Sequence, residues 1–78
     1  MLMSQKMVEE IKILLHFNLN TTLEGIKIHH TAAPETIDAV RRLHDKGLVT
    51  QVDGGYLTDL GRTAAEHASA CYTILMSG

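Results

Sequence analysis

Five histidines and one cysteine are the side chains of this 78-residue chain best suited to metal binding or catalysis. A zinc site requires three or four ligands that converge in space, but His29 and His30 are adjacent, so their rings diverge in a helix or a strand. The sequence contains no His-x-x-x-His, Cys-x-x-Cys or His-Glu-x-x-His spacing. His44 and His67 fall at or within predicted apolar faces, where a hydrogen-bonded core histidine is the simpler interpretation. We therefore expect no metal and no cofactor.

Enzymatic chemistry is not indicated either. Cys71 falls on the predicted apolar stripe of the last helix, where a thiol is unreactive. No glycine-rich phosphate loop precedes a predicted helix. We expect a protein that is not an enzyme and that has no small-molecule ligand.

Four basic residues offer a different chemistry, which is contact with phosphate groups. Arg41, Arg42 and Lys46 lie on a predicted helix, and Lys27 precedes it. Proteins that bind DNA meet the phosphates with uncompensated cations. These four side chains are therefore the candidate contacts to double-stranded DNA.

Acidic residues on the same predicted helix compete for these cations. Asp38 and Arg42, and likewise Arg41 and Asp45, stand four residues apart and can pair across one helical turn. The net charge of −2 provides no global basic field that would attract nucleic acid. The alternative to DNA binding is therefore a protein-interaction domain. In it, this helix face is solvated, and its acidic and basic side chains pair with one another.

Length and composition indicate one globular domain over residues 1–78. The chain is 45% hydrophobic and 21% charged, which is ordinary for a folded protein. No stretch is long and apolar enough to cross a membrane, and the first residues lack the pattern of a signal peptide. A single cysteine fits a reducing compartment, so we expect a cytoplasmic protein without a membrane partner.

The segment 43–61 predicts a helix end, a hairpin and a helix start. Gly47 can close a helix in the left-handed conformation, and the β-branched segment 48–52 favours a strand. Asp53-Gly54-Gly55 is typical of a tight turn, after which Thr58 or Asp59 caps a new helix. We expect a hairpin at about 48–58 and a C-terminal helix at about 60–76.

Two of the helices expected before this hairpin have clear start signals. Ser4 is the expected N-cap of a helix at about 4–18, with a main apolar stripe formed by Met7, Ile11, Leu14 and Leu15. Pro34 fits the first position of a second helix, which ends near Lys46 and turns Ala33, Ile37, Val40 and Leu43 inward.

The segment 20–30 is compatible with two structures. Thr21-x-x-Glu24 has the form of a capping box, and Leu23 and Ile26 stand three apart, which favours a short helix. Ile26-Lys27-Ile28 alternates apolar and polar residues, and Gly25 suits the start of a strand. We predict the helix, giving a helix-turn-helix at about 21–46, and keep the strand as the alternative.

This order of elements resembles a winged helix-turn-helix domain of the MarR-like kind. The resemblance rests on Leu43 with Lys46-Gly47-Leu48-Val49, on the turn Asp53-Gly54-Gly55, and on Leu57-Thr58-Asp59-Leu60-Gly61-Arg62. Through "EGIKIHHTA", "RLHDKGLVTQVDGGYLT" and "LGRTAAEHA" the chain is also similar to a family of short, uncharacterised bacterial proteins described as DNA-binding. The resemblance implies a mainly α fold with a small β-hairpin and an added C-terminal helix, acting as a small bacterial transcriptional regulator.

Apolar surface beyond what one small domain needs predicts a homodimer. Ile13 and Phe17 lie off the main stripe of the first helix, and the apolar arc of the last helix extends from its main stripe, which includes Leu75, to Tyr72 and Met76. We expect these five residues to form the dimer interface. The alternative is a monomer in which Phe17 folds back over the segment 21–30.

Overall fold

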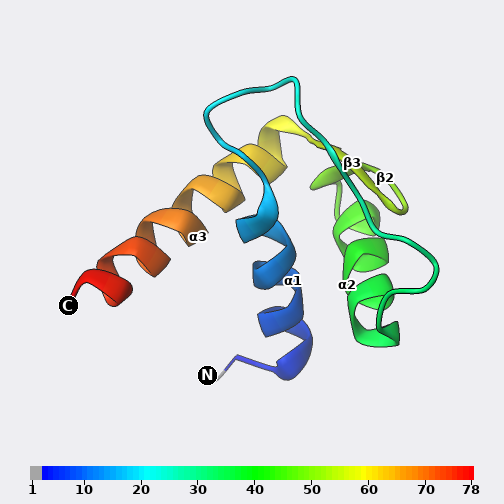
Figure 1. The fold of residues 1–78 in the computed structure, drawn as a ribbon, viewed down its shortest axis with the longest axis horizontal. Coiled ribbons are helices and arrows are strands. Elements are labelled where there is room, and N and C mark those ends of the chain that lie inside the picture. Colours follow the sequence, from blue (N-terminus) through cyan, green and yellow to red (C-terminus); the bar gives the residue numbers. More distant parts are fainter. Residues whose placement is uncertain (1–2) are drawn as a thin grey trace.

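The computed structural model describes residues 3–78, which form three helices and a small antiparallel sheet. In chain order the elements are α1 (Gln5–His16), β1 (Ile26–Lys27), α2 (Pro34–Asp45), β2 (Val49–Gln51), β3 (Gly54–Leu57) and α3 (Asp59–Ser77). The strand order is β1-β3-β2. Helix α1 packs against both α2 and α3, and the second half of α3 extends away from the other helices (Figure 1). None of the described helices combines the length and the hydrophobicity needed to cross a membrane.

The predicted helix starts are confirmed, two of them by a side-chain cap and the third by a proline in the first turn. The Ser4 hydroxyl accepts a hydrogen bond from the Met7 N–H at 3.2 Å and begins α1. Pro34 stands in the first turn of α2. The Thr58 hydroxyl accepts from the Gly61 N–H at 3.0 Å and begins α3. Each cap satisfies an N–H group that a helix leaves without a partner in its first turn.

The predicted hairpin is confirmed, with its tight turn at Val52-Asp53 rather than at 53–55. Val49 pairs with Leu57 and Gln51 with Gly54, so β3 carries one extra residue opposite Thr50. Gly55 adopts φ +75° at this bulge, and a Cβ there would lie 2.4 Å from the Thr50 hydroxyl. Glycine is therefore required by both conformation and space.

The helix predicted within 21–30 is wrong, and the alternative strand is correct. Ile26 and Lys27 pair with Gly55 and Gly54 of β3, and the Ile28 N–H donates to the Asp53 carbonyl at 2.8 Å. The Thr21 hydroxyl accepts from the Leu23 N–H in a local turn, so it caps no helix. Pairing with the free edge of the hairpin satisfies the backbone here. As a result, α2 is the only helix between β1 and β2 in the described chain, and the first helix of the expected helix-turn-helix is replaced by a strand.

The face of α1 that enters the core differs from the predicted stripe. Ile13, Leu14 and Phe17 are buried there, whereas Met7 is 43% exposed. Ile13 and Phe17 therefore lie in the core of a single chain, where they cannot serve a dimer interface as predicted. The core is completed from the other elements by Ala39, Val40, Leu43, Val49 and Ala65.

The face of α3 that enters the core also differs from the prediction. Its buried residues are Gly61 and Ala65, while Cys71, which was expected on the apolar stripe, is exposed. The backbone of Gly61 lies so close to the Leu48 carbonyl that a Cβ would be 1.8 Å from its oxygen. Small residues allow this approach, so the helix turns them inward and leaves larger apolar side chains outside.

Candidate nucleic-acid interface

The four cations expected to contact phosphate separate into two pairs. Lys27 on β1 and Arg41 on α2 are exposed. Arg42 and Lys46 turn towards α1, where both meet the carboxylate of Glu10. Two of the four candidates are therefore available to an external phosphate, and two have an internal partner.

Glu10 joins α1 to the end of α2. Its residue exposure is 7%, and its Oε2 lies 3.0 Å from Arg42 Nε. The Lys46 ammonium donates to the other oxygen, Oε1, and Arg42 Nη2 donates to the Lys6 carbonyl at 3.2 Å. The expected pair between Asp38 and Arg42 is therefore not made, because Arg42 reaches a buried carboxylate instead.

The charge of Glu10 is retained at neutral pH. Burial raises the pKa of its carboxyl, but hydrogen bonds from Lys46 and Arg42, reinforced by their charges, lower it by more, so the pKa lies below its ordinary value. An ionised Glu10 compensates part of the positive charge of both partners. This contact weakens the attraction of α2 for an external anion.

The outward face of α2 is left with an excess of negative charge. Arg41 lies 3.9 Å from Asp38, and both side chains are about 60% exposed, so their pairing is weak. The sequence suggested that Arg41 pairs with Asp45, but in the structure Arg41 contacts Asp38, three residues earlier. The exposed charged residues of this face are Glu35, Asp38, Arg41 and Asp45, three acids against one base.

Lys27, the other exposed candidate, lies on β1 at the edge of the sheet. Lys27 stands opposite Gly54, directly beside the hairpin, and the exposed His29 and His30 follow it. The hairpin tip itself consists of Val52 and Asp53 and adds no positive charge. Any phosphate contact near this hairpin therefore starts from β1 rather than from the tip.

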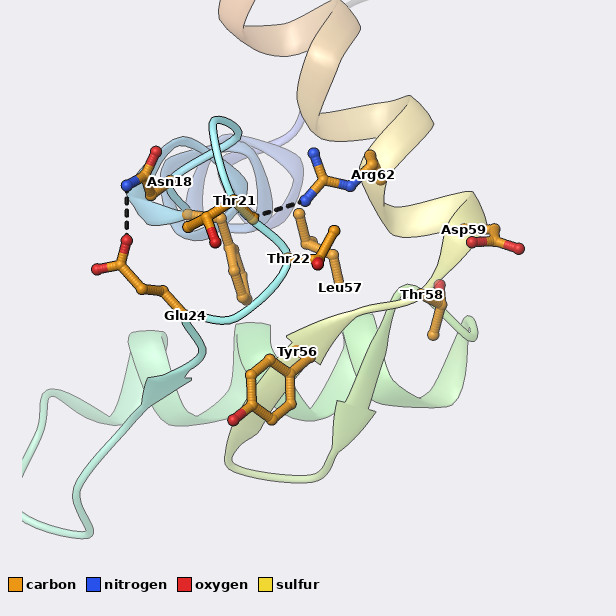
Figure 2. A pocket seen from close by; sticks show the side chains of 10 residues that line it. Asn18, Thr21, Thr22, Glu24, Tyr56, Leu57, Thr58, Asp59 and Arg62 are labelled. Atoms are coloured by element: carbon orange, nitrogen blue, oxygen red, sulfur yellow. Dashed lines mark hydrogen bonds between the residues drawn. The ribbon is translucent and has the colours of Figure 1, made fainter.

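A small hollow of about 220 Å³ lies between the segment 17–24 and the start of α3 (Figure 2). The Arg62 guanidinium at its edge donates to the carbonyls of Leu19 and Thr21 at 3.1 and 3.0 Å. Across the hollow, the Asn18 amide donates to Glu24 at 2.6 Å. These contacts tie the connection between α1 and β1 to α3, so the polar groups act as a structural clamp.

The histidines and the cysteine do not converge. Among residues 3–78, no three His, Cys, Asp or Glu side chains are placed to hold a metal ion. His67 and Cys71 are exposed, contrary to the apolar positions predicted for them, because α3 is rotated towards Gly61 and Ala65. His44 is half-buried, with Nδ1 3.8 Å from Asp45 Oδ1.

The sequence did not identify Glu10 as part of this region. The residues Glu10, Ile13, Leu14 and Phe17 have the i, i+3, i+4, i+7 spacing of one helical face. A carboxylate on an otherwise apolar face indicates a buried partner, because an unpaired buried charge is strongly unfavourable. That spacing was the signal available for finding it.

Three helices, a three-stranded antiparallel sheet and a hairpin following α2 define a mainly helical domain that is compatible with the winged-helix layout. A family model matches residues 1–76, and the chain belongs to this family, the family of unknown function DUF5669. No curated protein and no solved structure matches the chain.

Proposed function

We propose that this chain is a non-catalytic winged-helix protein of the MarR-like kind that binds double-stranded DNA weakly, with little sequence preference, as a small transcriptional regulator. The observation that carries the proposal is the placement of α2 directly before the β2–β3 hairpin, with Lys27 of β1 beside that hairpin. In winged-helix proteins such a helix and hairpin approach the duplex together. Lys27 and Arg41 are then the primary phosphate contacts.

The small number of free cations limits the affinity. Each phosphate neutralised on B-DNA contributes about −0.9 to the slope of log K against log salt. Two contacts per chain, from Lys27 and Arg41, give a slope of about −2. Arg42 and Lys46 contribute only to the extent that the phosphate competes with Glu10.

Fluorescence anisotropy of a labelled generic duplex, measured from about 50 to 200 mM salt, tests this proposal. We expect measurable binding at low salt that weakens with the stated slope and is largely lost in Lys27→Ala/Arg41→Ala. Lys12→Ala is the matched control, since Lys12 is an exposed lysine on α1 that contacts Glu9. Absence of binding at about 50 mM salt, or equal losses in the control, would overturn DNA binding.

The second candidate is a protein-interaction domain that does not touch DNA. It is favoured by the outward face of α2, where Glu35, Asp38 and Asp45 outnumber Arg41. Such a face suits a basic protein surface. This candidate predicts no salt-dependent binding to the duplex, and a partner whose binding is lost in Asp38→Lys/Asp45→Lys but retained in Glu24→Lys.

A further inference from the structure

The second half of α3 is an apolar helix face that lacks a partner among residues 3–78. At 1.5 Å per residue α3 is about 28 Å long, and α1 packs against its first part (Figure 1). Ala65 is fully buried, but every residue from 70 to 78 is exposed. Tyr72 lies seven residues after Ala65 and thus on the same side of the helix. The face that enters the core therefore continues outward into solvent.

The composition of this segment indicates that it is covered. Tyr72, Leu75 and Met76 are 53%, 74% and 68% exposed, and no Asp, Glu, Lys or Arg follows Glu66. Surface helices normally carry charged residues opposite an apolar stripe. Short helical segments also gain most of their stability from packing, and residues 3–78 supply little of it here, since every residue from 70 to 78 is exposed.

A groove between α1 and α3 adjoins this face. Lys12, Leu15 and His16 line it from α1, and Ser69, Tyr72 and Thr73 line it from α3. The two helices diverge here, so the groove opens towards the end of α3 (Figure 1). One chain thus carries both an unpartnered apolar helix and a groove next to it.

We propose that the occupant of this groove is a second copy of the chain, so that the segment 69–77 of each protomer lies against α1 and α3 of its partner. A two-fold arrangement uses the same surface twice. The segment carries no formal charge, so two copies do not repel each other. The interface therefore consists of Leu15 with Tyr72, Leu75 and Met76, rather than of Ile13 and Phe17.

The available area fits a small, reversible dimer. A helix about 11 Å across and about 13 Å long has a side surface of roughly 450 Å², of which about half can face a partner while the side with Ile74 stays outside. Helix segment and groove together then bury roughly 450 Å² per partner, or about 900 Å² in total, which is at the low end of specific interfaces. In Figure 1 the hairpin lies on the other side of α1 from this segment, so the dimer leaves it accessible.

Analytical ultracentrifugation of the full chain from about 1 to 100 μM tests the dimer. We expect twice the chain mass for the wild type, the single-chain mass for Tyr72→Glu, and the dimer mass for Ile74→Glu. Ile74 is the matched control because it is 69% exposed and lies two residues, or about 200°, around the helix from Tyr72. Circular dichroism and thermal unfolding check that each variant is folded.

The pairing of the groove with the partner helix has its own test. Leu15→Lys alone and Met76→Glu alone should each sediment as monomers. Met76 is 68% exposed and does not line the groove of its own chain. An equimolar mixture of the two variants should form a dimer, because one site then brings a lysine to a glutamate and the other site is wild-type.

A monomeric wild type at 100 μM, equal dissociation by Ile74→Glu, or a mixture that stays monomeric would overturn the proposal. The dimer does not depend on DNA binding. A dimer without affinity for duplex would contradict only the proposed function.

Discussion

Arg42 donates a 3.0 Å hydrogen bond from Nε to Oε2 of Glu10, across 32 positions of sequence, and so joins α2 to α1. Lys46 binds the other oxygen of the same carboxylate. The contact holds the two helices together. It also compensates two of the four cations that the sequence offered for phosphate binding.

Glu10→Gln tests whether this carboxylate restrains DNA binding. Removal of its charge leaves Arg42 and Lys46 uncompensated, so we expect tighter binding to duplex and a salt slope near −4 instead of −2 per chain. Stability should fall by about 1–2 kcal/mol, because hydrogen bonds to a charged group are lost. Anisotropy and urea unfolding measure the two effects.

Glu9→Gln is the matched control for Glu10→Gln, because it changes the net charge equally on the same helix but affects Lys12 instead. Equal gains in DNA affinity for both variants would show that the change in net charge alone causes the tighter binding. A gain confined to Glu10→Gln supports a specific restraint on Arg42 and Lys46.

The same contact predicts acid sensitivity. Because the pKa of Glu10 is lowered in the folded state, its contribution to stability is fully present above the ordinary glutamate pKa of about 4.3. That contribution is lost as the pH falls through the lower folded pKa. Urea unfolding from pH 7 to 3 should show a steeper loss for the wild type than for Glu10→Gln, and parallel curves would contradict this assignment.

Local signals in the sequence predicted the element ends well. Ser4, Pro34 and Thr58 begin their helices as expected, and Gly47 follows α2 with φ +78°. Caps, proline and positive-φ glycines act within a few residues, so their effect can be read without knowing the rest of the fold.

Non-local contacts decided the elements that the sequence misassigned. The capping-box pattern at Thr21 favoured a helix, but the edge of β3 offers Ile26 and Lys27 backbone partners that lie 27 to 29 residues further along the chain. Likewise, the rotation of α3 follows from the approach of Gly61 to Leu48. The approach of Gly61 to Leu48 leaves no periodic signal in α3, and the alternation at 26–28 spans only three residues, too few to outweigh the capping-box pattern.

The candidate site shows the same division between local signals and non-local contacts. The basic residues of α2 could be listed from the sequence, but their availability depends on Glu10, a residue of another helix. Whether a cation is free is a tertiary property. The charges along α2 alone therefore suggested Asp38 as the partner of Arg42, whereas Arg42 pairs with Glu10 of α1.

Gly61→Ala should destabilise the protein although it lies within a helix. At an exposed helical site this change stabilises by up to about 1 kcal/mol. Here the new methyl group would lie 1.8 Å from the Leu48 oxygen, so the backbone must move, and we expect a loss of about 2–3 kcal/mol. Thermal unfolding measures this loss of stability. Thr63→Ala, an exposed site on the same helix, should stay within about 0.5 kcal/mol.

Arg62→Ala should release the connection between α1 and β1. Its guanidinium binds the carbonyls of Leu19 and Thr21, of which Figure 2 shows the contact to Thr21. Loss of both hydrogen bonds should lower stability by about 1–3 kcal/mol. Hydrogen exchange should rise chiefly over 18–25, because this segment then loses its tie to α3 while α1 and α2 keep their mutual packing.

Arg62→Lys separates the geometry of this clamp from its charge. An ammonium has the same charge but not the fixed fork of a guanidinium, so we expect partial protection of 18–25 if binding two carbonyls is what orders the segment. Arg41→Ala is the matched control, since Arg41 is exposed and lies only near Asp38. Equal exchange over 18–25 in wild type and Arg62→Ala would show that the segment is held instead by the pairing of β1 with β3, through Ile26 and Gly55.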